Sequence, residues 1–373
     1  MKIVIAAGGT GGHLYPAVAL AREFIREEPE TGVLFVGTAR GIEAGVLCHE
    51  GFELQSIKAL PFMGVGLGGA LCALRALPVG LWQSLRILRT RRPDVVIAIG
   101  GYGSPAVIIA AFLLRIPRVL LEPNAYAGLA NRVLSPFAHR VFVAFESATS
   151  GFSRRKVRVV GSPIRREFMQ QGGDASRVAR NGRSVLLVFG GSQGARPIND
   201  AMIEALPYLG SLRERMEVVH QTGEADRQRV QDAYQGAGFR AQVLPFLFDM
   251  PQRLQAATLV VARAGAITLA EITASGRVAV LIPLPHAIYD HQAHNAQVLE
   301  SVGAAMVVPQ SVLSGERLAG VITDLLSDPE RLRQMGERSR GLGRTDSAEV
   351  IVRECMTLVK KRSAVSDQPT AQR

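Results

Sequence analysis

Residues 1–16 read Met1-Lys-Ile-Val-Ile-Ala-Ala-Gly-Gly-Thr-Gly-Gly-His-Leu-Tyr-Pro16, and this stretch decides the fold of the 373-residue chain. Small and β-branched apolar residues open it and predict a buried strand over 2–7. A glycine-rich turn follows at 8–12, and residues 16–28 have helical spacing, with Pro16 in the first turn, where proline is tolerated. A strand, a glycine turn and a helix in this order present backbone N–H groups and a helix N-terminus to an anion or a sugar.

Two later stretches repeat this design. They are Val95-Val-Ile-Ala-Ile-Gly-Gly-Tyr-Gly-Ser-Pro105 and Val185-Leu-Leu-Val-Phe-Gly-Gly-Ser-Gln-Gly-Ala195. Strands and helices alternate around them, which is typical of doubly wound parallel sheets, and we expect the three turns to lie at one cleft. The predicted strands are 2–7, 33–36, 95–99, 118–122, 141–143, 157–160, 185–189, 217–219, 241–244, 258–261, 278–282 and 305–308. The predicted helices are 16–28, 42–49, 80–92, 104–115, 126–135, 195–206, 226–236, 250–255, 266–275, 290–302 and 315–326.

The alternation stops once and then restarts, which predicts two domains. The interruption is a Gly-Ser-Pro sequence at 161–163 and a polar stretch at 172–183. We therefore expect an N-terminal domain over 1–162 and a C-terminal domain over 163–342. A helix at about 343–362 is expected to pack back on the first domain, and residues 363–373 are expected to form a disordered tail.

Composition narrows the class of protein. The chain is 47% hydrophobic and 20% charged, as folded globular proteins are. Its three cysteines, Cys48, Cys72 and Cys355, form no CxxC pair, which argues against a disulfide framework and favours a reducing cytoplasm. The N-terminus reads as a core strand and not as a signal peptide. The net charge of +11 suits an anionic membrane surface or an arginine-rich solvated surface, and no motif supports nucleic-acid binding.

Residues 59–92 are apolar and carry Trp82, the only tryptophan, and a run of arginines. Glycine, proline and Arg75 interrupt the run too often for a spanning helix. Arginines follow the apolar residues closely, which predicts an interfacial contact with an anionic membrane. The alternative is a buried helix pair.

Motif spacing excludes several chemistries. The chain has no GxxxxGK[ST], HExxH or GxSxG sequence, and His291 and His294 have no third metal ligand in view. One alternative stays open. Gly101-Tyr-Gly-Ser-Pro-Ala106 satisfies the GxGxxG/A pattern and Glu122 follows at the spacing of a ribose-binding acid, so a dinucleotide site is a rival interpretation.

Candidate binding chemistry is densest in the second half. Arg263-Ala-Gly-Ala-Ile-Thr-Leu-Ala-Glu271 follows a predicted strand, so Ala266, Ile267 and Thr268 would begin a helix whose N–H groups point at a phosphate. Glu271 lies one turn further on, at a distance suited to ribose hydroxyls, or is an ordinary glutamate favoured by the helix dipole. The polar cluster at 290–295 suits recognition of sugar hydroxyls.

Four motifs in this order resemble the bacterial peptidoglycan N-acetylglucosaminyltransferases. They are residues 8–13, residues 190–196, residues 263–271 and Asp290-His-Gln292. The resemblance spans roughly residues 2 to 345 and implies the GT-B fold, with two Rossmann-like doubly wound parallel-sheet domains facing across a cleft. It further implies an inverting, metal-independent transfer of N-acetylglucosamine from its UDP donor to the 4-hydroxyl of the undecaprenyl-linked acceptor lipid I. That reaction takes place at the cytoplasmic face of the inner membrane, where the enzyme is peripheral, and it needs no cofactor.

The resemblance also implies which residues bind the substrates. Carried over position by position, the donor contacts fall on Thr10, Gly11, Gly12, Asn124, Arg165, Ser192, Leu247, Ala266, Ile267, Thr268, Leu269, Ala270, Glu271 and Gln292. Backbone N–H groups at Gly9, Gly101, Tyr102 and Gly103 are expected to hold the acceptor diphosphate. The chain departs from the family at Pro123, where Gln is usual, at Ala262, where Ser or Cys is common, and at His291, which is Gln in some members.

The expected mechanism is a single in-line displacement. The acceptor hydroxyl attacks the anomeric carbon, and UDP leaves while helix N-termini at Ser192 and Ala266, with Arg165, stabilise its charge in place of a metal. His13 is the candidate base, because imidazole is poised near neutral pH; the alternative is that it only donates or accepts a hydrogen bond. Competing functions are another GT-B enzyme acting on UDP-sugars (a glycolipid transferase or a 2-epimerase), a dinucleotide-dependent oxidoreductase and a non-catalytic membrane scaffold.

Overall fold

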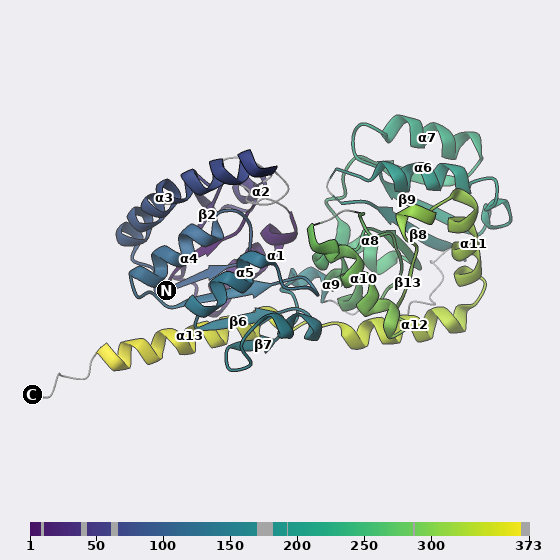
Figure 1. Cartoon of the computed structure of the whole chain (residues 1–373). Coiled ribbons are helices and arrows are strands. Elements are labelled where there is room, and N and C mark those ends of the chain that lie inside the picture. Colours follow the sequence, from purple (N-terminus) through teal and green to yellow (C-terminus); the bar gives the residue numbers. More distant parts are fainter. Residues whose placement is uncertain are drawn as a thin grey trace, which may run out of the picture. The chain divides into compact units, whose positions relative to one another are not determined.

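The computed structural model describes residues 1–8, 11–38, 43–60, 66–169, 182–191, 193–285 and 288–366 (Figure 1). These residues form two compact units. The first comprises Met1–Arg165 and the C-terminal segment that begins at Thr345, and the second comprises Arg166–Arg344. The sequence predicts the divisions after residues 162 and 342, and the structure has them two or three residues further on.

The first unit is built on a seven-stranded parallel sheet in the order β3-β2-β1-β4-β5-β6-β7. Its strands are β1 (Lys2–Ala6), β2 (Gly32–Gly37), β3 (Glu53–Ser56), β4 (Val95–Ala98), β5 (Arg118–Glu122), β6 (Arg140–Val143) and β7 (Val157–Val159). Central strand β4 is apolar throughout, and β1 is apolar after its exposed Lys2, because helices cover both faces of a parallel sheet. Strand β3 is not foreseen by the sequence, since its alternating signal is weak and it lies at the edge with mostly polar residues.

Helices α1 (Gly11–Glu27) and α13 (Ser347–Ser366) pack on one face of this sheet, around Ile3 and Ile5. Helices α3 (Gly66–Arg91), α4 (Ser104–Leu113) and α5 (Leu129–Leu134) cover the other face, around Val4 and Ala6, while α2 spans Glu43–His49. The alternate residues of β1 thus point into two separate cores. The Ser347 hydroxyl donates to the Val160 carbonyl at 2.6 Å and ties α13 to this unit.

Three predictions about helix ends are wrong. Helix α1 begins at Gly11 and not at 16, so that Pro16 lies in its second turn; the helix still forms because the residue loses only one backbone hydrogen bond there. Helix α3 is continuous from Gly66 with Pro78 inside it, although the sequence predicts a helix only over 80–92. Helix α13 continues to Ser366 because no Gly or Pro interrupts it, whereas the tail is predicted to start at 363; residues 367–373 lie outside the described chain.

The second unit is built on a six-stranded parallel sheet in the order β10-β9-β8-β11-β12-β13. Its strands are β8 (Ser184–Phe189), β9 (Met216–Gln221), β10 (Arg240–Leu244), β11 (Leu259–Ala262), β12 (Val278–Leu281) and β13 (Ala305–Val307). Its helices are α6 (Arg196–Ala205), α7 (Arg227–Gly236), α8 (Met250–Ala256), α9 (Ala266–Ala274), α10 (His291–Ser301), α11 (Gly315–Leu326) and α12 (Pro329–Leu342). The prediction of two doubly wound parallel sheets is therefore confirmed.

Strand order reverses once in each sheet, and these positions determine where ligands bind. In the first sheet the reversal lies between β1 and β4, and in the second it lies between β8 and β11. Open parallel sheets bind ligands at the carboxyl ends of the strands on either side of such a point. All three glycine turns, and the segment 263–271, directly follow one of these four strands. Among the described helices, none has the length and hydropathy needed to cross a membrane.

Candidate functional site

In the second unit, the reversal point places the start of α9 at the end of β11. Gly265 precedes the helix in an extended conformation, and α9 begins at Ala266, as the sequence predicts. No side chain caps this N-terminus within the described chain, although a helix start leaves several N–H groups without intrahelical partners. The first turn of α9 therefore has the hydrogen-bond donors and the positive end of the helix dipole that an anion requires.

The side chains of α9 divide into a buried face and a partly exposed face. Ala266, Ile267 and Leu269 are buried, so these predicted donor-binding residues have only backbone groups to offer. Thr268 and Glu271 are partly exposed and lie three residues apart, which puts them on the same face of the helix. Ala270 is also partly exposed. The helix thus carries a hydroxyl and a carboxylate on its partly exposed face, within the first two turns from its N-terminus.

Gln292, on the first turn of α10, joins the loops that follow β11 and β12. Its Oε1 atom accepts hydrogen bonds from the backbone N–H of Ala264 at 3.2 Å and of Leu284 at 3.0 Å. The buried Asn295 amide adds a bond to the Ala264 carbonyl at 3.2 Å. Because both lone pairs of the Gln292 oxygen are used in this way, only the amide N–H groups of this side chain could donate to a ligand.

Arg263 has a role that its position in the motif does not reveal. It is the one cation of that motif, yet it is 7% exposed, and burial lowers its pKa. Its guanidinium donates to the carbonyls of Ile282 at 3.0 Å and Pro283 at 3.2 Å and to Gln310 Oε1 at 2.7 Å. Arg263 therefore supports the loop after β12, and its guanidinium is occupied by protein partners.

A glycine turn follows β8, the strand that pairs with β11 in the second sheet. Gly191 and Gly194 have positive φ angles of 100° and 74°, which only glycine adopts without strain, and α6 begins at Arg196. Ser192, a predicted phosphate contact, lies outside the described residues. Leu247 lies in the loop between β10 and α8 and is 5% exposed, so it too offers backbone groups.

In the first unit, the turns after β1 and β4 pack directly against each other. A Cβ atom on Gly101, whose φ is 84°, would lie 2.3 Å from the Gly8 carbonyl oxygen. One on Gly100 would lie 3.0 Å from Nε2 of His13, which is in the first turn of α1. Only glycine fits at these two positions, and the close approach holds the imidazole at the reversal point of the sheet.

Several other residues predicted for this unit lie on α1, on the turn after β4 or against α1. Gly11 and Gly12 are the first two residues of α1, and Tyr102 is 41% exposed while Gly103 is buried. The Arg165 guanidinium carbon lies 5.5 Å from the centre of the Tyr15 ring on α1. Gly9 and Thr10 lie outside the described residues.

Glu122 is not a ribose-binding acid, so the dinucleotide interpretation loses its second residue. Its carboxylate is 2% exposed. Oε1 accepts the backbone and side-chain N–H groups of Asn124, both at 3.1 Å, and Oε2 accepts Gly128 N and Asn131 Nδ2, both at 2.9 Å. Burial raises the pKa of this carboxyl, and these four hydrogen bonds partly offset the effect. Glu122 instead shapes the loop that carries Asn124.

Among the residues that the structure describes, metal-ligating side chains do not gather at either reversal point. Within the described part of the chain, no group of three or more His, Cys, Asp or Glu residues is arranged to hold a metal ion. His291 and His294 lie on the first turn of α10.

Family models and sequence relatives agree on the family of this chain. The glycosyltransferase family 28 N-terminal domain matches residues 3–143, and the glycosyltransferase family 28 C-terminal domain matches residues 185–351. A UDP-N-acetylglucosamine–N-acetylmuramyl-(pentapeptide) pyrophosphoryl-undecaprenol N-acetylglucosamine transferase of Myxococcus xanthus is 46% identical, over 96% of this chain and 93% of its own length. The transferase of the same name from Syntrophotalea carbinolica is 47% identical, over 95% of this chain and 98% of its own length.

Solved structures agree with the sequence relatives. The crystal structure of Acinetobacter baumannii MurG has a TM-score of 0.76 and 28% identity, over 95% of this chain and 99% of the other. A UDP-GlcNAc 2-epimerase of Neisseria meningitidis has a TM-score of 0.65 at 15% identity, over 96% and 100%, which shows a shared fold alone.

Proposed function

We propose a function from one premise: this chain belongs to glycosyltransferase family 28 and, within it, to the UDP-N-acetylglucosamine–N-acetylmuramyl-(pentapeptide) pyrophosphoryl-undecaprenol N-acetylglucosamine transferases. It is a hexosyltransferase with the GT-B fold, and it transfers N-acetylglucosamine from UDP-N-acetylglucosamine to lipid I, which forms lipid II in peptidoglycan synthesis. The observation that carries the site assignment is the uncapped N-terminus of α9 at the reversal point of the second sheet, with Glu271 on its partly exposed face.

The reaction we propose is one displacement at the anomeric carbon. The 4-hydroxyl oxygen of the acceptor forms a bond to that carbon, the bond to the diphosphate breaks, and UDP leaves with both electrons. His13 takes the proton of the attacking hydroxyl. The N–H groups at the start of α9 stabilise the negative charge that grows on the departing diphosphate. The glycine turns after β1 and β4 bind the acceptor diphosphate through backbone N–H groups.

We expect UDP release that depends on a lipid-linked acceptor and is unchanged by chelator. The helix dipole and backbone N–H groups replace a metal in this proposal, so EDTA has nothing essential to remove. The measurement is incubation of the full chain with labelled UDP-N-acetylglucosamine, with and without a short-chain lipid acceptor, in EDTA. Release of UDP without acceptor, or complete inhibition by EDTA, would contradict the proposal.

Replacement of Glu271 by Gln is expected to raise the KM for the donor about 10- to 100-fold and to change turnover less than three-fold. Hydrogen bonds from ribose hydroxyls to a carboxylate contribute about 1.5–3 kcal/mol, and they are made equally before and during the reaction. Steady-state kinetics with varied donor measure both constants. Glu300→Gln, at an exposed glutamate near the other end of α10, is the control. A fall in turnover with donor affinity intact would remove Glu271 from this role.

We also propose that α3 carries the contact with an anionic membrane, at the cytoplasmic face of the inner membrane. Five exposed residues recur every three or four positions and so form one stripe on the helix, and they are Arg75, Val79, Trp82, Arg86 and Arg89. Trp82 is 61% exposed, and the Arg86 guanidinium carbon lies 6.0 Å from its ring centre. An aromatic ring flanked by arginines suits the headgroup region of an anionic bilayer. Residues 61–65 of the predicted 59–92 contact lie outside the described chain.

The double substitution Arg86→Gln/Arg89→Gln is expected to weaken binding to vesicles that contain phosphatidylglycerol about 10- to 30-fold at low salt. Each arginine near an anionic surface contributes about 1 kcal/mol. Vesicle cosedimentation measures the effect, with neutral phosphatidylcholine vesicles as the reference. Arg240→Gln, at an exposed arginine of the second unit, is the matched control. An equal loss with Arg240→Gln would refute the assignment to α3.

A further inference from the structure

A buried polar network lies behind the turns that follow β8 and β9. Its members are Asn199 on α6, His220 on β9 and Tyr234 on α7, and each is at most 1% exposed. His220 Nδ1 lies 3.1 Å from the Tyr234 hydroxyl, and His220 Nε2 lies 3.0 Å from Asn199 Oδ1. Three polar side chains placed in an otherwise apolar core cost stability unless every group is paired, so the arrangement calls for an explanation.

The direction of each hydrogen bond among these three side chains follows from Asn199. Its amide nitrogen donates twice, to the Thr222 carbonyl at 3.0 Å and to Asp226 Oδ2 at 2.9 Å, so Oδ1 is the acceptor. His220 therefore carries its proton on Nε2, and the Tyr234 hydroxyl donates to Nδ1. Burial lowers the pKa of His220 to about 3, which keeps the ring neutral at physiological pH, and the two hydrogen bonds select this tautomer.

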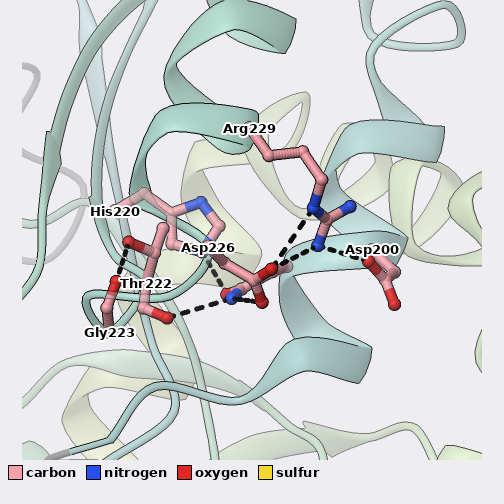
Figure 2. Close-up of polar contacts among 7 residues, drawn as sticks. Asp200, His220, Thr222, Gly223, Asp226 and Arg229 are labelled. Carbon is pink, nitrogen blue, oxygen red and sulfur yellow. Dashed lines mark hydrogen bonds and ion pairs between the residues drawn. The ribbon is translucent and has the colours of Figure 1, made fainter.

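Ion pairs of Arg229 hold the end of this polar network that is nearer to solvent. Arg229 lies 3.0 Å from Asp226 and 2.6 Å from Asp200, as Figure 2 shows. Burial by itself would raise the pKa of Asp226, but the hydrogen bonds from Asn199 and Arg229 outweigh it and lower that pKa. The carboxylate is thus ionised, and its bond with the Asn199 amide is charge-assisted.

The other end of this polar network binds the Thr222 carbonyl, which lies against the glycine turn after β8. A Cβ atom on Gly194 would lie 1.9 Å from the Thr222 carbonyl oxygen, which is the atom that Asn199 holds. One on Gly223, whose φ is 78°, would lie 2.2 Å from the Gln193 carbonyl oxygen. The backbones of the two turns are therefore in direct contact, and a displacement of Thr222 toward the turn after β8 would displace Gly194.

We infer that Asn199 and His220 are positioning residues for the nucleoside diphosphate of the donor: they fix Thr222, and Thr222 fixes the glycine turn after β8. The inference rests on the proposed function, because that function makes this turn part of the diphosphate site. Among Asn199, His220 and Tyr234, each N–H or O–H donor has one acceptor, so these side chains favour one position of Thr222. Catalytic and binding sites need such support, because the groups that touch the ligand must stay within about 0.5 Å of their productive positions.

The test is the affinity for UDP of three variants of the full chain. His220→Leu removes both hydrogen bonds of the ring, and His220→Gln retains an N–H donor for Asn199 Oδ1. Leu332→Ala is the matched control, because it opens a cavity in the same core on α12, at a residue that belongs neither to the polar network nor to the two turns. Calorimetry gives the Kd for UDP, kinetics give the separate KM values for donor and acceptor, and thermal unfolding gives the loss of stability.

His220→Leu should raise the Kd for UDP and the KM for the donor about ten-fold and leave the KM for the acceptor within two-fold. His220→Gln should restore most of the affinity, and Leu332→Ala should lower the melting temperature without changing the Kd. Unchanged UDP affinity in His220→Leu, or an equal loss in Leu332→Ala, overturns the inference. If His220→Leu does not fold, Tyr234→Phe decides, with a rise in Kd of about three-fold expected and no rise contradicting it. Wild-type chain that binds no UDP would instead refute the proposed function.

Discussion

Replacement of His13 by Ala is expected to lower turnover about 10²- to 10⁴-fold and to leave the KM for the donor within about three-fold. A positioned general base contributes acceleration of this size, because the attacking hydroxyl must lose its proton as the new bond forms. The imidazole is half-buried in the first turn of α1 and packs against Gly100, so it is held in one place. Steady-state kinetics with a soluble lipid acceptor measure the change.

The variant His13→Gln separates proton transfer from hydrogen bonding. Glutamine fills similar space and can donate or accept a hydrogen bond, but it cannot take up a proton at neutral pH. If the turnover of His13→Gln is as low as that of His13→Ala, the result supports His13 as the general base. Recovery to near the wild-type rate in His13→Gln, or near-normal turnover in His13→Ala itself, would leave His13 with a hydrogen-bonding role alone.

Replacement of Gly101 by Ala is expected to lower the free energy of unfolding by about 2–5 kcal/mol and to abolish measurable transfer. The new Cβ would lie 2.3 Å from the Gly8 carbonyl oxygen, and the φ of 84° adds strain for any residue with a side chain. Strain and overpacking each cost about 1–3 kcal/mol. The turns after β1 and β4 would have to separate, which removes the proposed site for the acceptor diphosphate. Urea unfolding and the transfer assay measure the two effects.

Gly51→Ala is the matched control for this substitution. Gly51 has a similar φ of 77°, but nothing lies within 4 Å of the position its Cβ would take. It should therefore show only the backbone cost, about 1–2 kcal/mol, with normal transfer. A Gly101→Ala protein no less stable than Gly51→Ala would show that the two turns can separate freely.

Local pattern predicts most of the fold correctly. The apolar runs at 2–7 and 95–99 and the helix start at Ala266 are where the structure has them, because a buried parallel strand and a glycine-led helix start each have a strong local signal. The start of α1 is predicted five residues late, because Pro16 is typical of a first helical turn and here lies in the second. Strand β3 has no such signal, since an edge strand needs no apolar core residues.

Residue identity and spacing also predict candidate residues for the donor site. The helix start at Ala266 and the carboxylate of Glu271 are predicted from one contiguous motif, whereas Gln292 is predicted as a donor contact from the family resemblance. The structural role of Glu122 is not predicted, since its spacing from the glycines at 101 and 103 suits a ribose contact. Only the fold shows that four N–H groups enclose its carboxylate.

What the chain reveals unaided is thus the class of each segment and the residue types able to bind a nucleotide sugar, because these depend on neighbours a few positions away. The partners of Arg263, Gln292, Asn199 and His220 depend instead on contacts between residues 8 to 47 positions apart. No local pattern records such pairings, since they arise when parallel strands bring distant loops to one edge of a sheet. Tertiary structure therefore separates the residues that face a ligand from those that hold the facing residues in place.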